Sequence, residues 1–315
     1  MSGLTNTDSE SGPSDSYAQG YDGEGFMEAL CNFTHFPALE SLVLHFREDD
    51  GPFKSDTEGN SDETRFPDSY IIQSLVFNTL AARGFPQLLK SLTIDKYLPL
   101  GHPVFGSRSG TAFLSNLNHL AIKTTTQCAA LPMTDPRSEV HGNAIFEKAI
   151  VPASLVSLEV HHADVRSAGM TIPVEEIHLP RLERLSFQRA YFSELEGGKI
   201  QDEMEGFIVR HGSTLRELEI FLCPMALSTT LSGEPPARFR RWVQVWEHLS
   251  GELKVLRNLV VSGRHDSKGV EDDSVPRYVD NCYYCNEVEL SEAEIVEDES
   301  ALRLFREKVE SRLPQ

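Results

Sequence analysis

A six-residue cassette recurs seven times along the chain: leucine, two variable residues, leucine, one variable residue, and an aliphatic or aromatic residue. The copies begin at Leu39, Leu89, Leu117, Leu155, Leu182, Leu215 and Leu256. Four copies follow an apolar residue and a proline, at Phe36-Pro37, Phe85-Pro86, Val151-Pro152 and Leu179-Pro180. Proline is tolerated at the first residue of a strand, so this approach suits a turn into a strand. Seven copies, four of which share this approach, indicate a repeat architecture.

The cassette spacing predicts a short strand. The second leucine and the residue two positions later point to one face, because strand side chains alternate. No single unit can bury this ridge, so neighbouring units are expected to stack their strands into a parallel sheet. Successive cassettes begin about 27 to 50 residues apart, which is an uneven spacing. We therefore predict an α/β fold: an irregular leucine-rich-repeat solenoid with strands on the concave side and helices on the convex side.

Return segments with helical spacing precede several cassettes. They span residues 70–83, 200–211, where Gly212 is placed as a stop, and 237–249. In the third helix, five apolar residues are expected on one face: Phe239, Trp242, Val243, Trp246 and Leu249. The longer gaps hold insertions, of which 47–69 is acidic and glycine-rich.

The charge distribution divides the chain. The formal net charge is -19, and the acidity is concentrated before residue 71 and between residues 271 and 299. Residues 1–30 are predicted to be a disordered acidic segment, 31–265 the repeat domain, and 266–299 an acidic linker or loop. Residues 300–315 are predicted to form a helix that caps the last repeat. Its apolar face carries Leu302, Phe305, Val309 and Leu313. The first repeat has no obvious cap.

Composition disfavours several classes of partner and location. A negative chain repels nucleic-acid phosphates and anionic membrane surfaces. No segment approaches the roughly 20 apolar residues of a transmembrane helix, and the N-terminus lacks the basic and apolar regions of a signal peptide. Five cysteines, an odd number at scattered positions, fit a reducing compartment. A cytoplasmic or nuclear location is expected.

The motifs that could carry chemistry are weak. Cys282 and Cys285 have the spacing of half a zinc site or of a redox pair, but there is no second pair. His161 and His162 are adjacent on a strand and face opposite sides, so they cannot chelate one metal together. No phosphate-binding glycine loop or nucleophile elbow is present. We expect no catalytic residue, metal or cofactor. The alternatives are an enzyme on a doubly wound α/β sheet and a metal- or redox-responsive protein using the two cysteines.

One compact basic cluster comprises Arg238, Arg240 and Arg241, interleaved with aromatic residues. On a helix the aromatic residues would point inward and the arginines outward, so a solvated helix face is the expected interpretation. Pairing of these arginines with an acidic tail is the alternative.

The cassettes, the segment 238–246 and the motif His211-Gly212-Ser213-Thr214-Leu215-Arg216-Glu217-Leu218 resemble the divergent repeat regions of fungal F-box proteins over roughly residues 33–263. The resemblance implies a substrate-recognition region of a ubiquitin ligase receptor. The F-box that contacts the adaptor in that family is not found in the first 30 residues. A Skp1-type adaptor is therefore expected as a partner only if an F-box exists outside this chain. A scaffold protein without a ligase link is the alternative.

The strand residues that flank each second leucine point away from the core and would line the inner curve of a solenoid, its usual binding surface. They are small and polar with a few charges, as on a protein-binding surface. The predicted partner-binding residues are Ser41, His45, Asp95, His119, Lys123, Glu159, His161, Arg184, Gln188, Glu217, Glu219, Phe221 and Asn258. The competing interpretation is a merely solvated sheet face.

Overall fold

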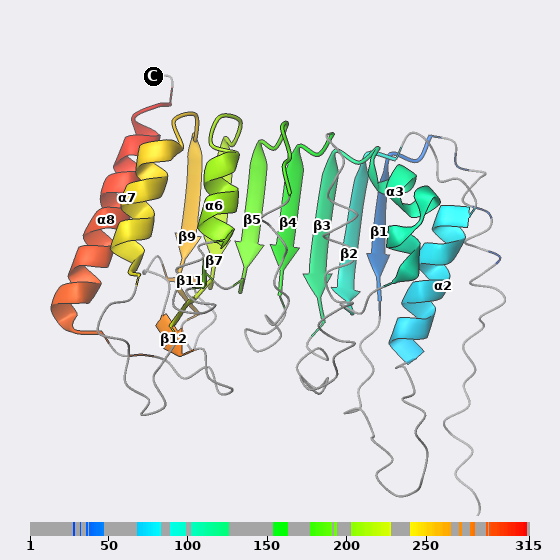
Figure 1. Cartoon of the computed structure of the whole chain (residues 1–315), viewed down its shortest axis with the longest axis horizontal. Coiled ribbons are helices and arrows are strands. Elements are labelled where there is room, and N and C mark those ends of the chain that lie inside the picture. The colour runs from blue at the N-terminus through cyan, green and yellow to red at the C-terminus, as the bar shows by residue number, and fades with distance from the viewer. Residues whose placement is uncertain are drawn as a thin grey trace, which may run out of the picture.

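The seven cassettes form the strands of one parallel sheet. The computed structural model describes residues 28, 32, 36, 38–46, 68–82, 89–98, 102–125, 154–162, 177–190, 192–193, 203–227, 240–265, 271–272, 278–280, 288 and 290–313. In this part the sheet comprises β1 (Ser41–His45), β2 (Ser91–Tyr97), β3 (His119–Thr124), β4 (Ser157–His161), β5 (Arg184–Gln188), β7 (Glu217–Phe221) and β9 (Asn258–Ser262). The strands lie side by side in chain order (Figure 1). The predicted α/β class and the parallel strands are confirmed.

Every neighbouring pair of strands aligns the same cassette position. Leu42 lies opposite Leu92, and this pairing of second leucines continues across the sheet to Leu259. The register is fixed just before each strand. The Glu40 carbonyl accepts hydrogen bonds from the N–H groups of Lys90 and Ser91, at 2.8 and 3.0 Å. The same double acceptance recurs at each of the six junctions between neighbouring strands.

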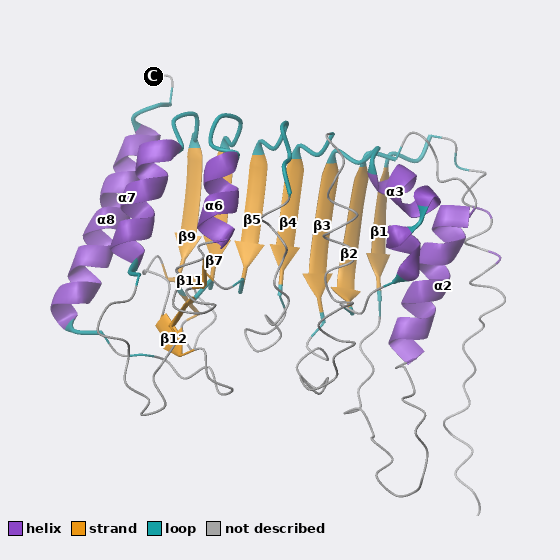
Figure 2. Ribbon diagram, viewed as in Figure 1, coloured by secondary structure: helices purple, strands orange, loops and turns teal. Residues whose placement is uncertain are grey.

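The sheet has one buried face and one open face. The second leucines and the residues two positions later point into a single hydrophobic core, together with the first leucines. Helices contribute to this core from one side of the sheet: α2 (Asp68–Ala82), α3 (Arg108–Leu114), α6 (Glu203–Arg210) and α7 (Trp242–Glu252). In Figure 2, α6 is drawn in front of the last strands, α2 and α3 at the β1 end of the sheet and α7 at the β9 end. The other face carries the residues that flank each second leucine.

The predicted return helices are present as α2, α6 and α7, but the third begins later and buries a partly different set of residues than predicted. The third helix begins at Trp242, and its buried face is formed by Trp242, Val245, Trp246 and Leu249, whereas Val243 is only half-buried. Phe239 lies outside the described residues. Helix α3 and the 3-10 turn η2 (Pro103–Gly106) before it were not predicted.

The motif at residues 211–218 has a structural explanation. The imidazole Nδ1 of His211 donates to the Phe207 carbonyl of α6 at 2.7 Å, and its Nε2 accepts the Leu179 N–H at 2.9 Å. The ring is buried, and burial lowers its pKa, which favours this neutral, doubly bonded form. His211 thereby ties α6 to the turn that leads into the preceding cassette.

The C-terminal helix is longer than predicted. Helix α8 (Glu292–Glu310) begins eight residues before residue 300, because Ser291 and Glu294 form a reciprocal capping box. The predicted inward residues Leu302, Phe305 and Val309 are buried, but Leu313 lies beyond the helix and is 49% exposed. Helix α8 packs against α7 and against β9, the last strand of the sheet (Figure 1).

Two small sheets each include one strand from the predicted acidic linker. One is parallel and comprises β6 (Phe192–Ser193), β8 (Met225–Leu227) and β12 (Tyr278–Asp280). The other is an antiparallel pair of β10 (Arg264–His265) and β11 (Glu271–Asp272). Residues 266–299 therefore contain ordered strands and the first turns of α8. Residues 1–27 and most of 47–69 lie outside the described residues. Within the described residues, no helix is long and apolar enough to cross a membrane.

Two helical glycines predict opposite responses to alanine. A Cβ on Gly110 would lie 2.1 Å from the Val104 carbonyl oxygen, whereas a Cβ on Gly206 would have no atom within 4 Å. We expect Gly110→Ala to lower the free energy of unfolding by about 2 kcal/mol or more through this clash. Gly206→Ala should raise it by about 0.5–1 kcal/mol through helix propensity. Urea unfolding of the two variants measures both, and equal signs would contradict the described packing of η2 on α3.

Candidate functional site

The open face of the sheet holds all thirteen predicted partner-binding residues in three aligned rows. The first row comprises Ser41, Ser91, His119, Ser157, Arg184, Glu217 and Asn258. The second row comprises Val43, Thr93, Ala121, Glu159, Ser186, Glu219 and Val260. The third row comprises His45, Asp95, Lys123, His161, Gln188, Phe221 and Ser262. Adjacent members lie about 4.8 Å apart. The local alternation of the cassette thus predicted which residues the fold brings together.

Exposure varies across this face. Val43 on the edge strand β1 is 64% exposed. Between the larger side chains of the inner strands, the small residues Ala121, Ser157 and Ser186 are buried. The open face therefore presents half-exposed polar side chains with small buried residues between them. A molecule that bound to this face would contact the larger side chains.

Two close pairs of side chains lie on the open face. The His45 Nδ1 is 2.6 Å from the Asp95 Oδ2, and the Arg184 Nε is 3.4 Å from the Glu217 Oε1. The Arg184 and Glu217 side chains are 57% and 43% exposed. Ion pairs this exposed contribute about 0–1 kcal/mol to stability. Their charges can be exchanged for a partner's charges at small cost to the fold.

His161 is the most perturbed group on the open face. Its Nε2 lies 3.1 Å from the Ser186 hydroxyl. Burial and then the positive charge of Lys123 lower its pKa to about 4, so the ring is neutral at pH 7. A general base works best with a pKa near the ambient pH, so this histidine is a weak base for activating Ser186. Its neighbour His162 is buried on the opposite side, as expected from alternation.

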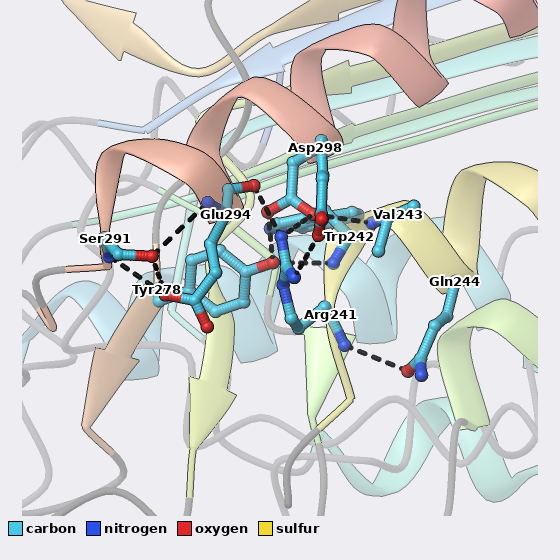
Figure 3. A network of polar contacts seen from close by, with 9 residues as sticks. Arg241, Trp242, Val243, Gln244, Tyr278, Ser291, Glu294 and Asp298 are labelled. Carbon is cyan, nitrogen blue, oxygen red and sulfur yellow. Dashed lines mark hydrogen bonds and ion pairs between the residues drawn. The ribbon is translucent and has the colours of Figure 1, made fainter.

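A second polar cluster joins α7, α8 and β12 (Figure 3). The Asp298 carboxylate accepts hydrogen bonds from the Tyr278 hydroxyl at 2.6 Å, the Val243 N–H at 2.9 Å and the Arg241 Nη2 at 3.0 Å. The Tyr278 hydroxyl in turn accepts the Trp242 N–H at 2.6 Å. The free N–H groups at the start of α7 are thus satisfied by side chains of later segments, which is a structural role.

Burial sets the protonation states in this cluster. It raises the pKa of Tyr278 far above the ordinary value for tyrosine, so the phenol keeps its proton and donates a hydrogen bond to Asp298. Burial also raises the pKa of Asp298, while the hydrogen bonds from Tyr278, Val243 and Arg241 oppose that shift.

The two described arginines of the basic cluster, Arg240 and Arg241, do not lie on a solvated helix face as predicted. The Arg240 Nε and Nη2 contact the buried carboxylate of Glu205 in α6 at 3.0 and 2.5 Å, and His248 of α7 contacts the same carboxylate. Arg241 pairs with Glu297 and Asp298 of α8. The alternative, pairing with an acidic tail, therefore holds for Arg241. Arg238 lies outside the described residues.

The sequence reasoning missed Glu205, Tyr278 and Asp298. Their partners lie 20 to 57 residues away in sequence, so no local spacing marks them. The Ser291–Glu294 capping box, which fixes the start of α8, was the one available local signal.

The described residues give no support to a metal or thiol site. No cluster of three or more potential metal ligands occurs among them. Cys223 is buried, and burial raises the pKa of its thiol to about 12, which makes it a poor nucleophile at neutral pH. Cys282 and Cys285 lie outside the described residues.

Comparison with protein-family models, curated proteins and solved structures finds no match for this chain. The function is therefore inferred from the geometry of the open face and from the resemblance noted in the sequence.

The depressed pKa of His161 predicts a pH dependence of stability. The pKa is about 4 in the folded chain against 6.5 for an unperturbed histidine, so between these values the unfolded chain binds the additional proton. The free energy of unfolding must then fall as the pH is lowered from about 6.5 to about 4. His161→Gln should flatten this slope by up to about 1.4 kcal/mol per pH unit. Urea unfolding at stepped pH measures the slope, and an unchanged slope would contradict the buried, neutral state of His161.

Proposed function

We propose that the chain is a protein-interaction module built as an irregular leucine-rich-repeat solenoid, whose open sheet face is the concave, partner-binding side. Stacking of strands in chain order, with one cassette per strand and helices over one face, supports this architecture. The five scattered cysteines support a place in a reducing compartment, the cytoplasm or the nucleus.

The observation that carries the proposal is the register of the open face. Seven strands present three aligned rows of side chains, which gives one continuous surface rather than an isolated pocket. Its exposed ion pair of Arg184 and Glu217 stabilises the fold little and remains available to a partner. The weak basicity of His161 and the raised pKa of the Cys223 thiol favour binding over catalysis.

The resemblance to the repeat regions of fungal F-box proteins supports a more specific version, in which the partner is a substrate delivered to a ubiquitin ligase. Copurification of an adaptor subunit with the full-length protein from its native cell tests this version. A scaffold role predicts the same open-face partner without the adaptor.

Exchanging the charges of one open-face pair tests the binding surface. The double variant Arg184→Glu/Glu217→Arg keeps the net charge and the pair but inverts its direction. We expect it to lose captured partners at least tenfold while the melting temperature changes by less than about 2 °C, since the pair contributes little stability. Quantitative mass spectrometry after affinity purification from the native cell measures the capture.

The matched control inverts an equally exposed pair away from the open face. Arg303 and Glu307 of α8 form a surface ion pair of 4.0 Å, with side chains 69% and 57% exposed. Arg303→Glu/Glu307→Arg should leave capture unchanged. If both double variants capture the same proteins as the wild type, the open face is not the binding surface.

A further inference from the structure

In the middle of the open face two glutamates flank the short residue Ser186, and the position between their carboxylates is here termed the slot. Glu159 of β4 and Glu219 of β7 are both registered with Ser186 of β5, which lies between them. The Cα atoms of the two glutamates are therefore separated by about 10 Å, two strand spacings. Ser186 is short and buried, whereas the two glutamates that flank it are half-exposed.

Among the residues that the structure describes, the two carboxylates have no cationic partner in hydrogen-bond or ion-pair distance. No hydrogen bond or ion pair engages the side chain of Glu159 or Glu219, both described residues. Arg184, one strand residue before Leu185, is already paired with Glu217. The Ser186 hydroxyl between the two glutamates is bonded to His161.

An aromatic ring lies beside the slot. Phe221 is half-buried on the same face of β7, two residues beyond Glu219. A lysine or arginine side chain combines an apolar stem with a charged head, and it can pack its stem or its cation on such a ring. Two unpaired carboxylates beside a half-exposed phenylalanine therefore complement a basic side chain in both charge and shape. An anionic ligand, such as a nucleic acid, would be repelled here.

We propose that the open face over β4, β5 and β7 binds an extended basic segment of a partner protein, with a lysine or arginine inserted between Glu159 and Glu219 and resting on Phe221. This inference rests on the proposed function and specifies the chemistry of the partner. An extended form is proposed because Glu159, Ser186 and Glu219 lie in one row across three strands, which a single extended segment can span.

Binding of a short synthetic peptide tests the inference with the full chain. The probe is a fluorescent hexapeptide of alternating threonine and arginine, compared with one of alternating threonine and glutamine. Fluorescence anisotropy gives the affinity. Glu159→Gln/Glu219→Gln keeps the shape of the slot and removes both charges, and we expect about tenfold weaker binding of the arginine peptide. The matched control, Glu247→Gln/Glu252→Gln on the exposed side of α7, removes the same net charge and should weaken binding less than twofold.

The outcomes are decisive in both directions. Selective weakening by the slot variant, with the glutamine peptide bound no better than background, supports the inference. Equal weakening by both variants indicates general attraction to an acidic chain and overturns it, as does the absence of any measurable binding. If native partners are lost with Arg184→Glu/Glu217→Arg but retained with Glu159→Gln/Glu219→Gln, the binding face stands and only the basic-segment inference fails.

Discussion

The fold depends on one backbone interaction repeated at each junction between cassettes. The carbonyl of the residue before each strand accepts two N–H groups from the next cassette, as Asn118 does from Val156 and Ser157 at 2.8 and 3.0 Å. This double acceptance fixes where the next strand starts relative to its neighbour. Because strand side chains alternate, a slip of one residue would turn every leucine to the open face. The uneven return segments can then vary in length without changing the sheet.

The same constraint separates the two faces of the sheet. The leucines of every cassette reach one core, so the residues between them lie outside that core and many are polar. The open face therefore tolerates charge, including a carboxylate such as Glu159 with no cationic partner among the described residues. Because the opposite face carries the stability, the open face is free to vary in charge, as at the exposed pair of Arg184 and Glu217.

Local spacing predicted most of the sheet and the contents of its open face. The cassette alone placed Glu159, Ser186 and Glu219 in one row, because alternation and register depend on neighbouring residues. It could not predict where α7 begins or which carboxylates Arg240 and Arg241 contact. Both depend on Glu205 and Asp298, which reach this part of the chain only through the packing of distant segments. The acidic composition of the segment before residue 300 gave no indication of the first turns of α8. The sequence-local part of the fold was predictable, and the long-range polar contacts were not.

These contacts explain how the array of cassettes ends. Each internal strand has a neighbour on both sides, but β9 is paired only with β7. Helix α8 lies beside it, and its Arg306 donates to the Val261 carbonyl of β9 at 2.7 Å. The Arg241–Asp298 pair holds α8 to the start of α7. Strands β4, β5 and β7 are held on both sides and keep the slot walls at fixed spacing. A surface whose strands are paired on both sides would lose little entropy on binding, which favours the interior of the array for the proposed recognition of an extended segment.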